Sequence, residues 1–266
     1  MEKYYRIAGL TVAMDTFGRT EKQAAPYLID AVENPDIRVI SLFDEAKCRY
    51  PDLTDDYAEH LGTSVFFYKE LLKNYSGFLL HSSAVVMHEK AYLFSVNSGT
   101  GKSTHTSLWL KQFGDQAYIL NDDKPAVRLI DGIWYAFGTP WSGKNDISVN
   151  EGVPIAGICM LERGEKNEIE RFNGKKAIFE IYAQTNRPRM QEYRIKLLEL
   201  LDDLITNVPV WKMKCNMDPE AAQCSYEAMS FVDKEEKYEK EFNRYPCAGS
   251  VDYVGHNWMR TEGKKD

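Results

Sequence analysis

The sequence has 266 residues, of which 44% are hydrophobic and 27% charged, a composition typical of a globular protein with a substantial core. Its formal net charge of −7, without a dense basic patch, argues against nucleic acid and anionic membranes as partners. No apolar run approaches the ~18 residues needed to span a bilayer, and we expect no secretory signal. The five cysteines form no C-x-x-C pair, which favours free thiols in the cytoplasm over disulfides or a zinc site.

Alternating and β-rich runs predict more strands than helices. In chain order, strands are predicted at 4–14, 37–43, 78–86, 91–96, 117–120, 127–130, 133–137, 154–161 and 208–213. The polar break His88-Glu89-Lys90 and the pair Asp131-Gly132 predict hairpin turns. Helices are predicted at 103–113, 191–205 and 219–231, the last with Asp218 as its N-cap and Pro219 in its first turn.

These elements together predict an α+β, β-rich fold. We expect an N-terminal α/β region over residues 1–76 that packs on a core over residues 77–232. A charge-dense C-terminal tail is predicted over residues 233–266.

The most informative segment lies between a predicted strand and a predicted helix, which is the setting of a phosphate-binding loop. It runs Ser95-Val96-Asn97-Ser98-Gly99-Thr100-Gly101-Lys102-Ser103-Thr104. Small residues let backbone N–H groups turn toward phosphate oxygens, and the helix N-terminus favours negative charge. We therefore predict nucleotide binding by residues 97–104, with Lys102 on the β- and γ-phosphates and the Ser103 hydroxyl on Mg²⁺.

One position departs from the usual phosphate-loop pattern, which begins with glycine six residues before the lysine. Val96 stands there. The alternative interpretation of the segment is a glycine-rich turn that caps an ordinary helix.

Two adjacent carboxylates follow the strand predicted at 117–120. Asp122 and Asp123 at a strand end can divide two tasks, holding a metal ion and taking a proton from an attacking hydroxyl. A solvated turn or a helix cap is the alternative interpretation. His81 lies within a predicted strand, where a histidine is usually a core residue but can also orient a carboxylate or a phosphate.

A second loop rich in glycine and proline, Gly138-Thr139-Pro140-Trp141-Ser142-Gly143-Lys144, is either a plain β-turn or a second anion-binding loop. Its candidate contacts are Ser142, Gly143 and Lys144, together with Arg163 at the end of a predicted buried strand. Trp134 and Trp141 are candidates for stacking on a base or lining an acceptor pocket, although at this spacing packing is the more common role.

The order His81-Ser82-Ser83, then Gly101-Lys102-Ser103-Thr104, then Asp122-Asp123 resembles the HPr kinase/phosphorylase and phosphoenolpyruvate carboxykinase superfamily, most closely small HPr-kinase-related kinases. The resemblance covers residues 78 to about 163. It implies a β-rich phosphate-loop fold, in which Lys102 contacts phosphate and Ser103, Asp122 and Asp123 surround the metal. Asp122 or Asp123 would supply the base, assisted by His81. The sequence lacks the metal- and substrate-binding pattern of true carboxykinases.

The predicted function is therefore that of a cytoplasmic kinase that uses ATP and Mg²⁺ and phosphorylates a hydroxyl of a peptide, a protein serine or a small molecule. The alternative is a nucleotide-binding partner or sensor without chemistry of its own in a peptide-modification system. A carboxykinase-type enzyme is a third alternative. Relatives are often oligomers, which leaves a homo-oligomer open, and the sequence does not distinguish ATP from GTP.

Overall fold

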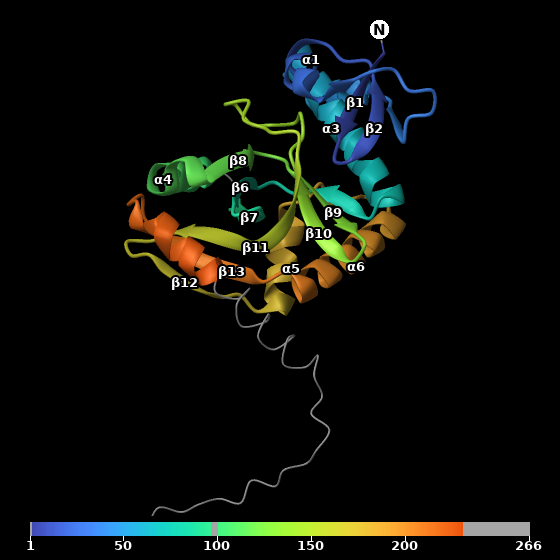
Figure 1. The fold of residues 1–266 in the computed structure, drawn as a ribbon. Coiled ribbons are helices and arrows are strands. Elements are labelled where there is room, and N and C mark those ends of the chain that lie inside the picture. Colours follow the sequence, from blue (N-terminus) through green and yellow to red (C-terminus); the bar gives the residue numbers. More distant parts are fainter. Residues whose placement is uncertain (1, 97–100, 231–266) are drawn as a thin grey trace, which may run out of the picture. The chain divides into compact units, whose positions relative to one another are not determined.

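A computed structural model describes residues 2–96 and 101–230 of the chain, all within one compact unit that spans residues 1–232 (Figure 1). The predicted tail at 233–266 lies outside the described residues. The described part combines strand-rich sheets with helices, as the predicted mixed, β-rich fold class requires.

A small sheet of order β3-β1-β2-β4 lies near the N-terminus. Its strands are β1 (Lys3–Ile7), β2 (Leu10–Met14), β3 (Leu28–Ile29) and β4 (Ile37–Val39). The prediction of one strand over 4–14 is wrong, because Ala8 and Gly9 have φ of 53° and 78° and close a hairpin between β1 and β2. The prediction of a strand over 37–43 holds only to Val39.

Helices that the sequence did not predict cover much of the first 76 residues. They are α1 (Gly18–Ala24), the 3₁₀ turn η1 (Ala25–Tyr27), α2 (Phe43–Arg49) and α3 (Asp55–Asn74). The buried face of α3 combines polar or small residues such as His60, Gly62 and Thr63 in its first half with large apolar residues in its second half. Gly62 is needed there, since a Cβ atom would stand 2.7 Å from the backbone carbon of Leu42.

The main sheet has nine strands, seven of them in the order β5-β9-β10-β11-β7-β6-β8, with β13 paired to β11 and β12 paired to β13. They are β5 (Gly77–Leu79), β6 (Ser83–Met87), β7 (Lys90–Ser95), β8 (Ala117–Asn121), β9 (Ala126–Ile130), β10 (Ile133–Phe137), β11 (Gly152–Arg163), β12 (Glu168–Arg171) and β13 (Val210–Cys215). Both predicted hairpins are present. The strand predicted at 78–86 is divided in two, because the chain leaves the sheet at residues 80–82.

The centre of this sheet is buried on both faces, since neighbouring residues of β7 alternate between two apolar clusters. Leu93 joins the cluster that contains α3 and α6 residues such as Leu71 and Leu201. Phe94 joins the second cluster, which contains Trp109 of α4. The remaining helices are α4 (Lys102–Phe113), the 3₁₀ turn η2 (Gly114–Gln116), α5 (Gly174–Ala183), α6 (Gln191–Asn207) and a helix over 220–230.

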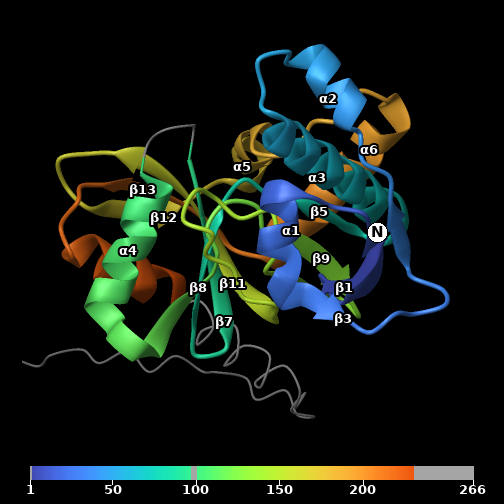
Figure 2. The same cartoon turned by 90° about the horizontal axis from the view of Figure 1, so that it is seen from above.

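Strand direction brings three chain segments to one end of the sheet. β6 lies between β7 and β8 and is antiparallel to both. The carboxyl ends of β7 and β8 therefore lie beside the amino end of β6, with Ser83 opposite Phe94 and Ala84 opposite Asn121. Lys102 at the start of α4, the acidic pair after β8 and His81 before β6 consequently meet there. Figures 1 and 2 both show α4 beside β8.

Candidate active site

His81 is the centre of the cluster at this end of the sheet. Its Nε2 lies 2.5 Å from Lys102 Nζ and 3.3 Å from Asp123 Oδ1, and its Nδ1 lies 3.2 Å from Gln184 Oε1. Backbone bonds fix the position of the ring, because His81 N–H donates to Gln184 O and Ser95 Oγ donates to His81 O. Three residues predicted from separate parts of the sequence are therefore in direct contact.

The protonation of the imidazole determines which partner it engages. With Nδ1–H donating to Gln184 Oε1, a neutral ring has a free lone pair on Nε2 that accepts from the Lys102 ammonium. A doubly protonated ring instead donates from Nε2 to the Asp123 carboxylate. Nε2 is thus the atom through which His81 bonds to either neighbour.

Lys102 is the first residue of α4, directly after Gly101, whose φ of 110° favours glycine. Burial lowers the pKa of Lys102 to about 8, although the charges of Asp123 and Asp122 oppose the shift. The position at a helix N-terminus and the partly buried ammonium both favour an anion at this point. Phosphate is the group for which such an arrangement is suited.

Asn121 shapes the turn that carries the acidic pair. Its side-chain oxygen accepts from the backbone N–H groups of Asp123 and Lys124 at 3.0 and 2.8 Å. Its amide donates to Thr139 O at 2.9 Å, which joins this turn to the second loop. Asn121 is fully buried, so these bonds replace water for the polar groups at the end of β8.

The two carboxylates have different surroundings. Asp122 is buried and accepts the Gly143 N–H on Oδ1 at 2.6 Å; burial raises its pKa, and the charge of Asp123 adds to the shift. Burial alone would also raise the pKa of Asp123, but the hydrogen bond from His81 and the charges of Lys124 and Lys102 lower it below its usual value. The pair is therefore asymmetric, with the pKa of one carboxyl raised and that of the other lowered.

The second loop lies against Asp122, but only part of it contacts the cluster. A Cβ atom on Gly143 would stand 2.9 Å from Asp122 Oδ2, so glycine permits the close approach. Ser142 is buried and Lys144 is exposed. Arg163 is exposed at the end of β11, opposite Cys215 of β13. A shared role of these four residues in anion binding stays a prediction.

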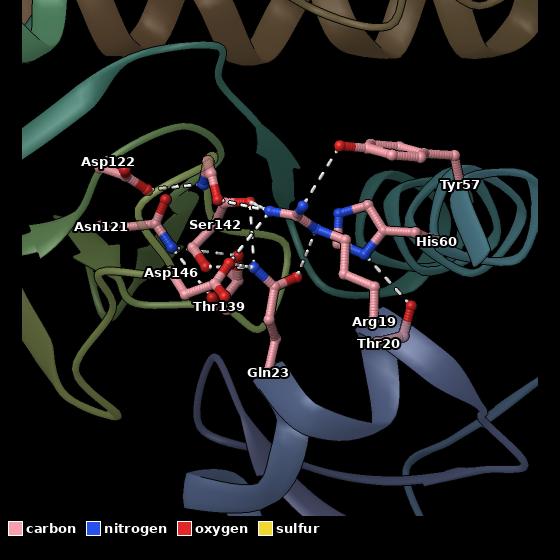
Figure 3. Close-up of polar contacts among 11 residues, drawn as sticks. Arg19, Thr20, Gln23, Tyr57, His60, Asn121, Asp122, Thr139, Ser142 and Asp146 are labelled. Atoms are coloured by element: carbon pink, nitrogen blue, oxygen red, sulfur yellow. Dashed lines mark hydrogen bonds and ion pairs between the residues drawn. The ribbon is translucent and has the colours of Figure 1, made fainter. Parts of the chain in front are cut away.

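Residues of α1 support this second loop, a contribution that sequence reasoning missed. Figure 3 shows Arg19 and Gln23 directed from α1 toward the loop. Arg19 donates to Gly143 O at 2.5 Å and pairs with Asp146 at 3.0 Å, and Gln23 donates to Ser142 Oγ at 2.9 Å. Since more than 110 residues separate these partners in sequence, no local sequence pattern predicts the contact.

The tryptophans near this loop are packing residues. Trp141 is fully buried, donates to Thr63 Oγ1 at 3.1 Å and packs on Phe67 with ring centroids 4.8 Å apart. Trp134 is buried and donates to Asp203 at 2.8 Å. Packing of both indoles in the core confirms the more common of the two interpretations.

The described part of the phosphate loop is limited to its two ends. Val96, in the place of the usual glycine, is buried in the apolar cluster that contains Phe94 and Leu108, so its side chain contributes to packing. Ser103 and Thr104 are exposed in the first turn of α4. The predicted nucleotide contacts Asn97, Ser98, Gly99 and Thr100 lie outside the described residues.

The donor set fits Mg²⁺ better than a transition metal. Within residues 2–96 and 101–230, no group of three or more His, Cys, Asp and Glu side chains is placed to hold a metal ion. Mg²⁺ needs no such cage, because it retains water and takes one or two carboxylates together with substrate phosphates. Asp122, Asp123 and the Ser103 hydroxyl offer oxygen ligands of this kind.

No family model matches the chain, and no curated protein matches it. Among solved structures, it is similar to the Hpr(Ser) kinase/phosphatase from Coxiella burnetii, with 12% identity over 62% of this chain and 94% of that chain and a TM-score of 0.30. At that TM-score the likeness carries no argument about what this chain does. No helix in the described part of the chain is long and apolar enough to cross a membrane.

Proposed function

We propose that the protein is a kinase that transfers the γ-phosphoryl group of ATP to a hydroxyl group in the presence of Mg²⁺. The observation that carries the proposal is the contact of His81 with both Lys102 and Asp123 at the N-terminus of α4. A cation, a helix N-terminus and a carboxylate joined through an imidazole match the needs of phosphoryl transfer, which depends on positioning and charge neutralisation.

Lys102 would neutralise charge on the β- and γ-phosphates. Its ammonium is partly buried and lies against His81 Nε2. A bound phosphate would offer it a stronger acceptor, since hydrogen bonds between charged groups are about twice as strong as neutral ones. Gly101 and the first turn of α4 would add backbone N–H donors.

Asp122, with Ser103, would hold Mg²⁺, which supplies neutralisation of the phosphate charge when bound. The Gly143 N–H fixes Asp122 Oδ1, so the carboxylate keeps one orientation. Asp123 would act as the base that accepts the proton of the acceptor hydroxyl, because its carboxylate contacts His81, to which a proton can pass. In the transfer, the acceptor oxygen bonds to the γ-phosphorus as the bond to the β,γ-bridging oxygen breaks.

The test is an incubation of the full chain with ATP, Mg²⁺ and a pool of hydroxyl acceptors that includes free serine and serine-containing peptides. Mass spectrometry reads phosphorylated products, and ADP formation gives the rate. Asp123→Asn should lower turnover about 100-fold or more, with ATP affinity measured by calorimetry largely retained. Lys102→Ala should weaken ATP binding itself.

Two outcomes would contradict the proposal. Full turnover in both Asp122→Asn and Asp123→Asn would remove the acidic pair from the chemistry. ATP binding by the wild-type chain without product from any acceptor would favour a nucleotide-binding partner protein instead.

A further inference from the structure

A cavity of about 180 Å³ lies against His81, beside the candidate active site. Its wall is formed by Leu79, His81, Lys124 and residues 183–186 at the end of α5 and just after it. This volume has room for a small polar molecule.

Lys124 gives the cavity a positive charge. Its backbone is held in place, since its N–H donates to Asn121 and its carbonyl accepts from Thr139 Oγ1 at 2.7 Å. Within the residues that the structure describes, no carboxylate lies at ion-pairing distance from its ammonium group. An anion bound in the cavity would therefore supply the counter-charge that Lys124 does not find within the described residues.

His81 connects this cavity to the reacting groups. One edge of the imidazole meets Gln184, which belongs to the cavity wall, and the other meets Asp123 and Lys102. A molecule in the cavity thus has Lys124 and His81 in its wall, and the imidazole of His81 links it to Asp123. A compound with an anionic group and a hydroxyl group satisfies both.

We propose that this cavity is the acceptor site and that the acceptor is a small hydroxylated carboxylic acid, with its carboxylate on Lys124 and its hydroxyl toward His81. This inference rests on the proposed kinase activity. The acceptor hydroxyl forms the new bond to the γ-phosphorus, ADP leaves with the bridging oxygen, and the hydroxyl proton passes by way of His81 to Asp123.

The experiment compares acceptors that differ in one group. L-serine and glycerate carry a carboxylate, whereas ethanolamine and ethylene glycol are the corresponding compounds without it. We expect kcat/KM for the carboxylates to exceed that for the neutral or cationic analogues by about 10- to 100-fold, the range of a hydrogen bond to a charged group. Lys124→Met should abolish this preference mainly through KM, and Lys124→Arg should restore much of it.

Lys176→Met serves as the matched control, because Lys176 is an exposed lysine of α5 outside the cavity wall. Urea unfolding of each variant separates loss of recognition from loss of fold. Serine-containing peptides with a free or an amidated C-terminus test whether the enzyme also phosphorylates a hydroxyl on a peptide. If a longer amidated peptide is phosphorylated as efficiently as the small acids, the inference is overturned.

The acceptor site and the kinase activity are contradicted by different results. The acceptor site is overturned if acceptors with and without a carboxylate are phosphorylated equally well, or if Lys124→Met changes only the KM for ATP. Either result leaves the kinase activity intact. Absence of transfer to every acceptor would overturn both.

Discussion

Gly143→Ala changes the position of Asp122 without removing any side chain from the site. An ideal Cβ atom on Gly143 would stand 2.9 Å from Asp122 Oδ2 and 3.1 Å from both Cγ and Oδ1. Real Cβ atoms essentially never approach within 3.0 Å, so the carboxylate or the loop must shift. Either movement stretches the 2.6 Å bond from Gly143 N–H to Asp122 Oδ1.

The size of the effect follows from that bond. A hydrogen bond to a charged group contributes about 1.5–3 kcal/mol, and a buried carboxylate has no ready replacement in water. We expect Gly143→Ala to lower turnover by about 10- to 100-fold and the free energy of unfolding by up to about 3 kcal/mol. Initial rates of ADP formation at saturating ATP and Mg²⁺, together with urea unfolding, measure the two quantities.

Gly174→Ala is the matched control. A Cβ atom there would meet Ile205 Cδ1 at 3.6 Å, an ordinary contact, so both quantities should stay close to wild type. Turnover of Gly143→Ala within twofold of wild type would refute the reasoning, because it would show that the orientation of Asp122 does not matter.

Three further predictions concern the surroundings of the site. Burial lowers the pKa of His60 to about 3, so only the unfolded chain gains this proton as the pH falls below about 6.5, and stability present above that pH is lost toward pH 3. This difference in protonation lowers the free energy of unfolding by about 2 kcal/mol at pH 5. The urea concentration at the midpoint of unfolding should therefore fall less between pH 6.5 and 5 for the His60→Gln variant than for wild type. Arg19→Met should reduce turnover less than Gly143→Ala does, because Gln23 still supports the loop, and exposed Lys22→Met on the same helix should have no effect on the rate. Leu201→Ala, in the core under α6, should cost about 2–5 kcal/mol in urea unfolding while turnover of the folded enzyme is retained.

The candidate site was more accessible to sequence reasoning than the fold that carries it. Asp122, Asp123 and Lys102 follow or begin elements with strong local signals, namely β8 and α4, and these elements were predicted within a residue or two. His81 was included through resemblance. Its contacts with Lys102 and Asp123 depend on the antiparallel placement of β6 between β7 and β8, which local periodicity does not determine.

The N-terminal region was predicted least well, for physical reasons. The turn at Ala8-Gly9 begins with alanine, whereas asparagine, aspartate or glycine would indicate a left-handed conformation at that position. The hairpin was therefore predicted as one strand. Helix α3 buries His60 and Thr63 against Thr20 and Trp141, so polar side chains interrupt the apolar face of the helix in its first half. The support of the second loop by Arg19 is likewise purely tertiary.

The most direct test of the kinase proposal is to follow the γ-phosphoryl group itself. ATP labelled with ¹⁸O on its non-bridging γ-oxygens is incubated with the full chain, Mg²⁺ and the acceptor panel, and products are weighed by mass spectrometry. The account predicts an acceptor phosphate that keeps all three labelled oxygens, with product lost in Asp123→Asn. Labelled inorganic phosphate alone, or no consumption of ATP at all, would contradict phosphoryl transfer to a hydroxyl at this site.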